Sequence, residues 1–289
     1  MRWRGERQSS NVEDVRYSGS GRRLPTGMKL GGGMTLLLLV VGLLLGQDPL
    51  QLLQIFLQSD VGVSTDSQPQ PRPAGNDEAA QFVSVILAST EDVWGKMFSG
   101  PGQRYPAPKL VLFSDGIESA CGINSSATGP FYCPSDQKVY LDLSFLNELR
   151  RMGASGDFAV AYVISHEVGH HIQNVIGTDR KFRQYQSQAR SQEQANALSV
   201  LMELQADCYA GVWANHAHSQ RQILEQGDVE EGLNAAAAIG DDRMQRMAGR
   251  RVNPDGFTHG SSQQRVQWFR TGMQSGDINA CDTFKQAGL

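Results

Sequence analysis

Hydrophobic residues recur at helical spacing in several long segments of the chain. Residues 77–98 place Phe82, Val85, Ile86, Trp94 and Met97 on one face. Residues 158–176 form a strongly apolar stretch that Gly177 ends, and residues 194–217 and 224–247 show further helical patterns, the last interrupted near Gly240. We therefore expect helices over these four segments.

Two shorter segments carry the pattern of strands. Residues 109–113 (KLVLF) form a brief apolar run, and residues 131–143 hold two β-rich runs separated by Pro134-Ser135-Asp136. Proline, serine and aspartate in this order favour a turn, so the second segment predicts a hairpin. The expected fold class is α+β, mainly helical with a small β-sheet, and no internal repeat is present.

An uncharged stretch of eighteen residues, 30–47, contains the run TLLLLVVGLLL. As a helix it would extend about 27 Å, which is enough to cross a thin bilayer. A cleaved signal peptide is the alternative, but the residues before the stretch are unusually many and no small-residue cleavage site follows it. The sequence favours a single uncleaved transmembrane signal anchor.

Charge is distributed unevenly around this stretch. Residues 1–29 hold seven Arg or Lys against three acidic residues, whereas the whole chain has a net charge of −4. The positive side of an anchor stays in the cytoplasm, so we expect residues 1–29 to be a disordered cytoplasmic tail. Residues 48–76, rich in Pro, Ser and Gln, would be a linker to a domain over 77–289 outside the cytoplasm. The acidic body argues against a nucleic-acid partner.

The chain has four cysteines: Cys121, Cys133, Cys208 and Cys281. None forms a C-x-x-C pair, so a thiolate zinc site is not expected. An even count suits two disulfides in an oxidising compartment, which agrees with the orientation of the anchor. Four buried thiols are the alternative. Three connectivities are possible, and we favour Cys121–Cys133, which closes a short loop, with Cys208–Cys281.

The run His166-Glu167-Val168-Gly169-His170 carries the clearest chemistry. Two histidines four residues apart on a helix lie on one face, so both imidazoles can bind one Zn²⁺. Glu167 follows the first histidine, where its carboxylate can reach a metal-bound water and act as general base. Because an apolar stretch precedes the run, these polar groups would be costly to bury unless they are paired or bind metal.

A hydrolytic zinc site needs a third protein ligand. The pattern H-E-x-x-H-x-x-G-x-x-H fails because Gln173 and Ile176 occupy the positions of its glycine and last histidine. Glu203 and Asp207 lie on a later predicted helix, one turn apart and among apolar neighbours. We predict that Glu203 is the third ligand and that Asp207 accepts a hydrogen bond from a ligand histidine and orients it.

Several stretches together resemble the bacterial putative neutral zinc metallopeptidase family, with its gluzincin-like H-E-x-x-H followed by E-x-x-x-D. They are NVEDVR, GPFYCP, VYLDLSF, GDFAVAYVISHEVGHHIQ, ELQADCYAGVWA, LNAAAAIGDDR and FTHGSSQQR. The resemblance implies a membrane-tethered, zincin-like domain with one zinc. From the anchor, its charge pattern and the cysteines we expect a protein of the bacterial inner membrane with its catalytic domain in the periplasm, and from the zinc motif a peptide or protein substrate. Two alternatives stay open: an envelope scaffold or chaperone with a structural zinc, and hydrolysis of a bond other than a peptide, such as a cell-wall cross-link.

Three further residues are weaker candidates. His259 and Arg265 lie in FTHGSSQQR, which is similar to a segment near the site of related gluzincins, so either could stabilise an oxyanion or order the wall of the site. A purely structural corner is an equal alternative. Tyr140, on the strand KVYLDL, could line a substrate cleft, and that strand could pair with an extended peptide.

Overall fold

The computed structural model describes residues 1–17, 77–100, 104–125 and 129–289. Helices are present in all four segments for which the hydrophobic periodicity predicts them. They are α3 (Glu78–Met97), α5 (Asp157–Ile176), α7 (Gln192–Arg221), α8 (Asp228–Ala238) and α9 (Asp241–Met247). Helix α5 ends at Gly177, whose backbone adopts φ 84°. Glycine takes this left-handed conformation without steric cost, which explains the stop at this residue.

Several helices are additional to the sequence predictions. They are α4 (Phe145–Arg151), α6 (Thr178–Ser187), α10 (Ser262–Ser275) and α11 (Thr283–Gln286), with 3₁₀ turns η2 (Pro254–Gly256) and η3 (Ile278–Cys281). Helix α10 begins with a capping box, in which the side chains of Ser261 and Gln264 each accept a hydrogen bond from the other residue's backbone N–H.

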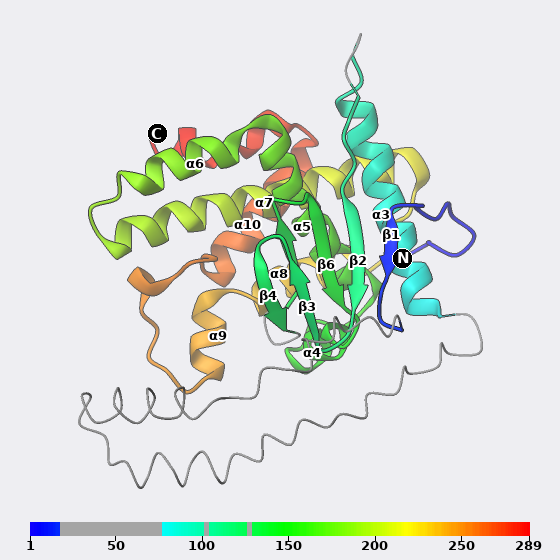
Figure 1. Cartoon of the computed structure of the whole chain (residues 1–289), viewed down its shortest axis with the longest axis horizontal. Helices are drawn as coiled ribbons and strands as arrows, with labels where there is room; N and C mark the ends of the chain where they lie inside the picture. Colours follow the sequence, from blue (N-terminus) through cyan, green and yellow to red (C-terminus); the bar gives the residue numbers. More distant parts are fainter. Residues whose placement is uncertain (18–76, 101–103, 126–128) are drawn as a thin grey trace, which may run out of the picture. The chain divides into compact units, whose positions relative to one another are not determined.

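A mixed four-stranded sheet has the order β1-β2-β6-β5. Its strands are β1 (Val12–Asp14), β2 (Lys109–Phe113), β6 (Lys138–Asp142) and β5 (Phe131–Cys133). Strands β1, β2 and β6 are parallel, and β5 is antiparallel to β6, which confirms the predicted hairpin. A separate hairpin of β3 (Gly116–Ser119) and β4 (Gly122–Ser125) lies in front of this sheet in Figure 1.

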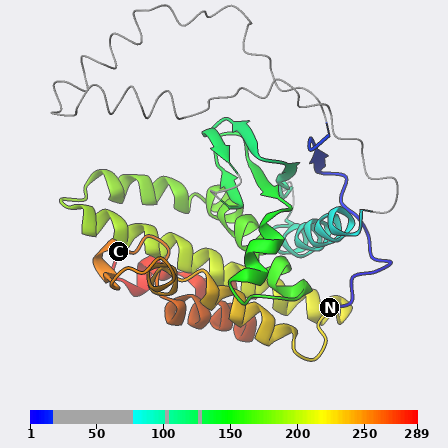
Figure 2. The ribbon, with the colours of Figure 1, turned by 90° about the horizontal axis from the view of Figure 1, so that it is seen from below.

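Figure 2 shows helix α10, in orange to red, on the far side of the molecule from the β3–β4 hairpin. Helix α5 contacts the sheet, α3, α7 and α8, and α7 makes an extensive contact with α10. Phe158, Tyr162, Trp213 and Phe269 are buried where these helices meet. The fold class is therefore α+β and mainly helical, as predicted.

Residues 1–16 are an ordered part of the same compact unit, so the prediction of a disordered tail is wrong for them. Strand β1 pairs with β2, and Glu13 binds Lys109 at 2.6 Å and Lys138 at 2.7 Å. Trp3 is buried and donates a hydrogen bond to Asp157, the first residue of α5, at 2.9 Å. The predicted tail was inferred from charge and low hydrophobicity, but these charges are paired across the fold.

This arrangement also bears on membrane topology. Residues 1–16 and the domain over 77–289 share one sheet, so they lie on the same side of any bilayer. A cytoplasmic tail at 1–16 combined with a domain outside the cytoplasm is incompatible with this pairing. The predicted anchor at 30–47 and the linker at 48–76 lie outside the described residues. Among the helices that the structure describes, none has the length and apolar character to span a membrane.

Candidate metal centre

Helix α5 carries His166, Glu167 and His170, and both histidines face Glu203 on α7. His166 and Glu167 are buried, with 5% and 8% of their surface exposed. Gly169 permits the two helices to approach closely, because a Cβ atom there would lie 2.9 Å from the carbonyl oxygen of Ala206 on α7. The glycine inside the motif therefore sets the distance between the two halves of the site.

Helix α7 supplies Glu203 opposite the two histidines, as predicted. Its Oε2 lies 3.2 Å from His166 Nε2, and its Oε1 lies 3.4 Å from His170 Nε2. Burial alone would raise the pKa of Glu203, but His170 and His166 outweigh it and hold that pKa well below its ordinary value. Glu203 is therefore an ionised carboxylate at neutral pH.

These three side chains suit a zinc ion. Among the described residues, His166, His170 and Glu203 form a group whose potential ligand atoms all lie within 4.8 Å of one another. Two imidazole nitrogens and a carboxylate oxygen are the donor set of His₂Glu zinc sites, in which one position stays open. The residues that the sequence predicted as ligands are thus brought together by α5 and α7.

Asp207 lies one turn after Glu203, fully buried behind His166. Its Oδ1 accepts a hydrogen bond from His166 Nδ1 at 2.8 Å, which leaves Nε2 to face the ligand group. Arg265 donates to both carboxylate oxygens, from Nε at 2.8 Å and from Nη2 at 2.9 Å, and the Tyr162 hydroxyl also donates to Asp207. The predicted role of Asp207 thus has a geometric basis.

The charges around Asp207 explain the pKa values of this cluster. Burial would raise the pKa of Asp207, but Arg265 and His166 lower it below the ordinary value. Burial would lower the pKa of His166, but Asp207 and Glu203 outweigh that effect and raise it to about 10. The pKa of His170 is also raised, because Glu203 outweighs burial.

Sequence reasoning missed two residues of this centre. One is Tyr162, whose hydroxyl donates to Asp207. The other is Gln173, whose Oε1 lies 2.8 Å from His170 Nδ1 and which the sequence analysis used only as a mismatch to another pattern. Helical spacing alone could have found both, since Tyr162 lies one turn before His166 and Gln173 lies three residues after His170.

The ligand group opens into a cleft of about 1010 Å³. Glu167 lines this cleft beside His166, His170 and Glu203. Much of the remaining wall is apolar, with Phe131, Phe145, Phe182, Met202 and Met244 among the lining residues. A carboxylate and a prospective metal thus share an open cleft with room for an extended chain.

His259 and Arg265 differ in their position at this cleft. His259 is half-exposed and lines the cleft, and its Nδ1 lies 3.3 Å from Asp241 Oδ1. The hydrogen bond to Asp241 raises the pKa of His259 above its ordinary value. Arg265 is 2% exposed, and its guanidinium donates to the Asp207 carboxylate.

The prediction that Tyr140 lines the cleft is wrong. Strand β6 is paired on both edges, by β2 and by β5, so it offers no free edge to a peptide. Tyr140 stacks on Phe131 with ring centroids 4.7 Å apart and donates to Asp136 at 2.7 Å. The hairpin places β5, not β6, at the edge of the sheet. The pattern of residues along the sequence does not reveal the order of the strands.

Strand β5 takes the position that the sequence assigned to β6. It is the last strand of the described sheet, and Phe131 and Tyr132 line the cleft. The Tyr132 hydroxyl lies 3.0 Å from His171 Nδ1 and accepts from Asn174 Nδ2 at 3.0 Å. Both partners lie on α5, so this strand is fixed directly to the helix that carries the motif.

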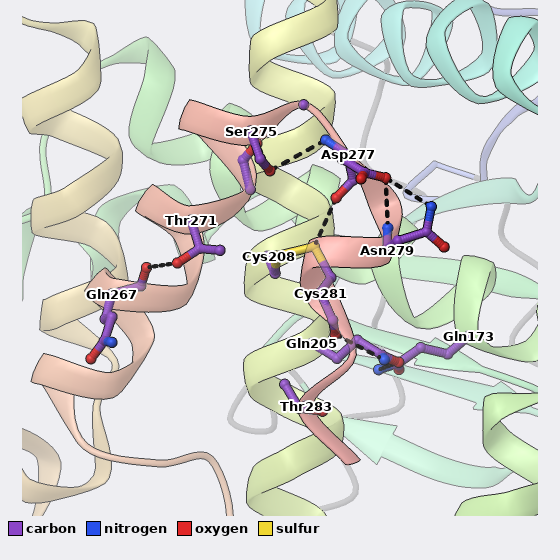
Figure 3. The surroundings of a disulfide bond; sticks show 12 residues. Gln173, Gln205, Cys208, Gln267, Thr271, Ser275, Asp277, Asn279, Cys281 and Thr283 are labelled. Carbon is purple, nitrogen blue, oxygen red and sulfur yellow. Dashed lines mark hydrogen bonds between the residues drawn. A yellow bond between two sulfur atoms is a disulfide. The ribbon is translucent and has the colours of Figure 1, made fainter. Parts of the chain in front are cut away.

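Both predicted disulfides are present, Cys121–Cys133 and Cys208–Cys281. The first links the β3–β4 hairpin to the end of β5. The second joins α7, at the residue after Asp207, to the C-terminal segment, as Figure 3 shows.

Comparison with known proteins gives a consistent result. A family model described as "Putative neutral zinc metallopeptidase" matches residues 1–284. The uncharacterized protein YpfJ of Escherichia coli K12 is 50% identical over 292 residues, which cover 98% of this chain and 99% of YpfJ. The uncharacterized protein Rv2575 of Mycobacterium tuberculosis is 41% identical over 227 residues, or 73% of this chain and 74% of Rv2575. No solved structure matches.

Proposed function

Because the chain belongs to the putative neutral zinc metallopeptidase family, we propose that it is a gluzincin-type peptidase that binds one zinc ion through His166, His170 and Glu203. The observation that carries the proposal is the position of Glu167, which lines an open cleft beside the three ligands. A purely structural zinc site has no need for an additional carboxylate in an open cleft.

Each residue of the centre then has a defined task. When bound, zinc supplies a Lewis acid that polarises the scissile carbonyl and lowers the pKa of water. Glu167 accepts the proton of the attacking water and delivers it to the leaving amine. His259, held by Asp241, faces the cleft as a hydrogen-bond donor for the oxyanion. Asp207 and Gln173 hold the two ligand histidines in the tautomer with a free Nε2.

The substrate in this proposal is an extended peptide that pairs with β5. This strand borders the sheet and lines the cleft through Phe131 and Tyr132. An extended chain can gain backbone hydrogen bonds at such an edge, and the apolar wall suits hydrophobic side chains. A structure with a bound peptide that makes no backbone contact to β5 would rule out this mode of binding.

The cellular site of action is proposed from the disulfides. Two disulfides join all four cysteines of the chain, and such bonds persist in oxidising compartments. We therefore place the domain outside the cytoplasm, together with residues 1–16. The apolar stretch 30–47 remains the candidate for membrane attachment.

Metal analysis and peptide-library digestion with the full chain test the proposal. We expect one zinc per chain and cleavage by the native protein. Glu167→Gln should retain zinc and lose activity by at least about 100-fold, because general-base catalysis contributes about 10²–10⁴. His259→Ala should also retain zinc, with a fall in kcat. Zinc binding without any cleavage in the native chain would instead favour the scaffold or chaperone with a structural zinc.

A further inference from the structure

Two buried amide side chains lie between helices α5 and α7, behind the metal centre. Gln173 is fully buried and Gln205 is 3% exposed. An amide removed from water needs hydrogen-bond partners for both its oxygen and its NH₂ group, or its burial is costly. The partners of these two amides therefore define how this region must be arranged.

The hydrogen bonds form one continuous path. Gln205 Nε2 donates to the carbonyl oxygen of Cys281 at 3.1 Å, and Gln173 Nε2 donates to Gln205 Oε1 at 3.1 Å. Gln173 Nε2 also donates to the Met202 carbonyl at 2.7 Å. Figure 3 shows Gln173, Gln205 and Cys281 in this sequence. We call the path from Cys281 through Gln205 and Gln173 to His170 the amide relay.

The relay fixes which ring nitrogen of His170 faces the ligand group. The NH₂ group of Gln173 has oxygen atoms as both of its partners, so the oxygen of this amide must face His170 Nδ1. That oxygen can only accept, so Nδ1 must carry the hydrogen and Nε2 must present its lone pair to the metal. The direction of the path is thus set by two backbone carbonyls, that of Met202 for Gln173 and that of Cys281 for Gln205.

The far end of the relay is anchored to α7 by covalent and polar contacts. Cys281 forms a disulfide with Cys208, and Thr283 donates to the Leu201 carbonyl at 2.8 Å. Cys208 directly follows Asp207, the carboxylate that holds His166. The C-terminal segment is therefore connected to the hydrogen-bond partners of both ligand histidines.

We propose that Gln173 and Gln205 are positioning residues that set the zinc affinity of this centre, and that the Cys208–Cys281 disulfide holds the carbonyl at which the relay ends. This inference rests on the proposed zinc centre. Its consequence is that a C-terminal segment, distant in sequence from the ligands, tunes metal binding without contacting the metal.

The zinc dissociation constant of the full chain, measured by competition with a chromophoric chelator, tests the relay. Gln205→Leu nearly conserves the side-chain volume and removes both hydrogen bonds of the Gln205 amide. We expect zinc to bind about 10–100-fold more weakly, which is the usual effect of removing a hydrogen-bond partner of a metal ligand. Asn215→Leu is the matched control. Asn215 also lies on α7 and donates its amide to a C-terminal carbonyl, that of Met273, at 2.8 Å, but no ligand residue follows on that path. Its zinc affinity should equal that of the native chain.

The two disulfides provide a second matched pair. Replacing Cys208 and Cys281 together by alanine should weaken zinc binding, whereas replacing Cys121 and Cys133 should leave it unchanged. When the Cys208/Cys281 replacement is combined with Gln205→Leu, the loss of zinc-binding free energy should be smaller than the sum of the two separate losses, because both changes break the same path. If Gln205→Leu does not fold, Gln205→Asn retains the amide but is too short to span both partners, and it should show the same loss.

The outcomes separate the relay from the proposed function. If Gln205→Leu and Asn215→Leu lower the melting temperature alike and both keep native zinc affinity, the relay is only structural and the proposal is overturned. If the native chain binds no zinc, both the proposed metal centre and the proposed role of the relay are refuted. A selective loss of zinc affinity in the Gln205 and Cys208/Cys281 variants supports both.

Discussion

Proton binding at His166 competes with metal binding at the same side chain. In the zinc-free protein Asp207 and Glu203 raise the pKa of His166 to about 10, although burial opposes them. A zinc ligand must offer an unprotonated Nε2, so the histidine has to release a proton when the metal binds. Glu203 requires no such release near neutral pH, because its own pKa is held low.

We therefore predict that zinc binding strengthens as the pH rises from 6 to 8. His166 stays protonated in the zinc-free protein throughout this range, so it alone contributes about a tenfold gain in affinity per pH unit. Titration calorimetry in two buffers with different ionisation enthalpies should detect at least one proton released per zinc. An affinity that is constant over this range would contradict the raised pKa.

At the same scale, the sequence predicted the ligands but not all their partners. His166, Glu167, His170 and Glu203 follow from helical spacing, because residues four apart on a helix share a face. Arg265 is 58 positions from Asp207 in sequence, and only the packing of α10 against α7 brings the two together. A buried carboxylate needs such a partner, but spacing does not say which arginine supplies it.

Helices α7 and α10 approach each other unusually closely. A Cβ atom on Gly272 of α10 would lie 1.9 Å from the carbonyl oxygen of Cys208 on α7. Helix α7 carries Glu203 and Asp207, so the distance between α7 and α10 affects the metal centre directly. Helix α7 also has a glycine at this crossing, since a Cβ atom on Gly211 would lie 2.1 Å from the carbonyl oxygen of Phe269 on α10.

We predict that Gly272→Ala lowers the free energy of unfolding by about 1–3 kcal/mol, because the helices must separate or distort. Gly95→Ala is the matched control. Gly95 lies inside helix α3, and a Cβ atom added there would meet no other atom within 4 Å, so this change should stabilise by about 0.5–1 kcal/mol. Urea unfolding of both variants measures the difference, and equal effects would show that the crossing can relax.

The elements themselves were largely predictable. Strand β2 matches the predicted run 109–113, and α3 and α5 begin and end within one residue of the predicted bounds. Strand β1 was missed because its three residues, Val12–Asp14, lie in a polar stretch without strand alternation. Its stability comes from pairing with β2 and from the ion pairs of Glu13, which are contacts with residues about a hundred positions away.

At the scale of the whole molecule, residues 1–16 and the domain over 77–289 form one compact unit. Residues 1–16 contribute an edge strand and a buried tryptophan to the unit that holds the metal centre. A chain that crosses a membrane once between these two parts could not form this sheet. Both parts must therefore lie in the same compartment.

Labelling of intact cells can check this topology. The chain has no free cysteine, and Ser10 and Gln286 are exposed, so each can be replaced singly by cysteine. We predict that a membrane-impermeant maleimide labels both variants if the domain lies outside the cytoplasm. If neither variant is labelled, the proposed compartment is refuted, but the pairing of β1 with β2 is not contradicted. Labelling of only one would contradict the pairing of β1 with β2.

The sequence by itself predicted the fold class, the long helices, the group of His166, His170 and Glu203 that could hold a metal ion, and the disulfide pairing that we favoured among three. These features depend on local periodicity and on residue chemistry at short spacing. Only the tertiary structure decided the order of the strands, the incorporation of residues 1–16 into the sheet, and the contacts of Arg265 and Gln205 behind the ligands. Each of these joins residues that are distant in the chain, and such contacts are fixed by packing and by the need to pair buried polar groups.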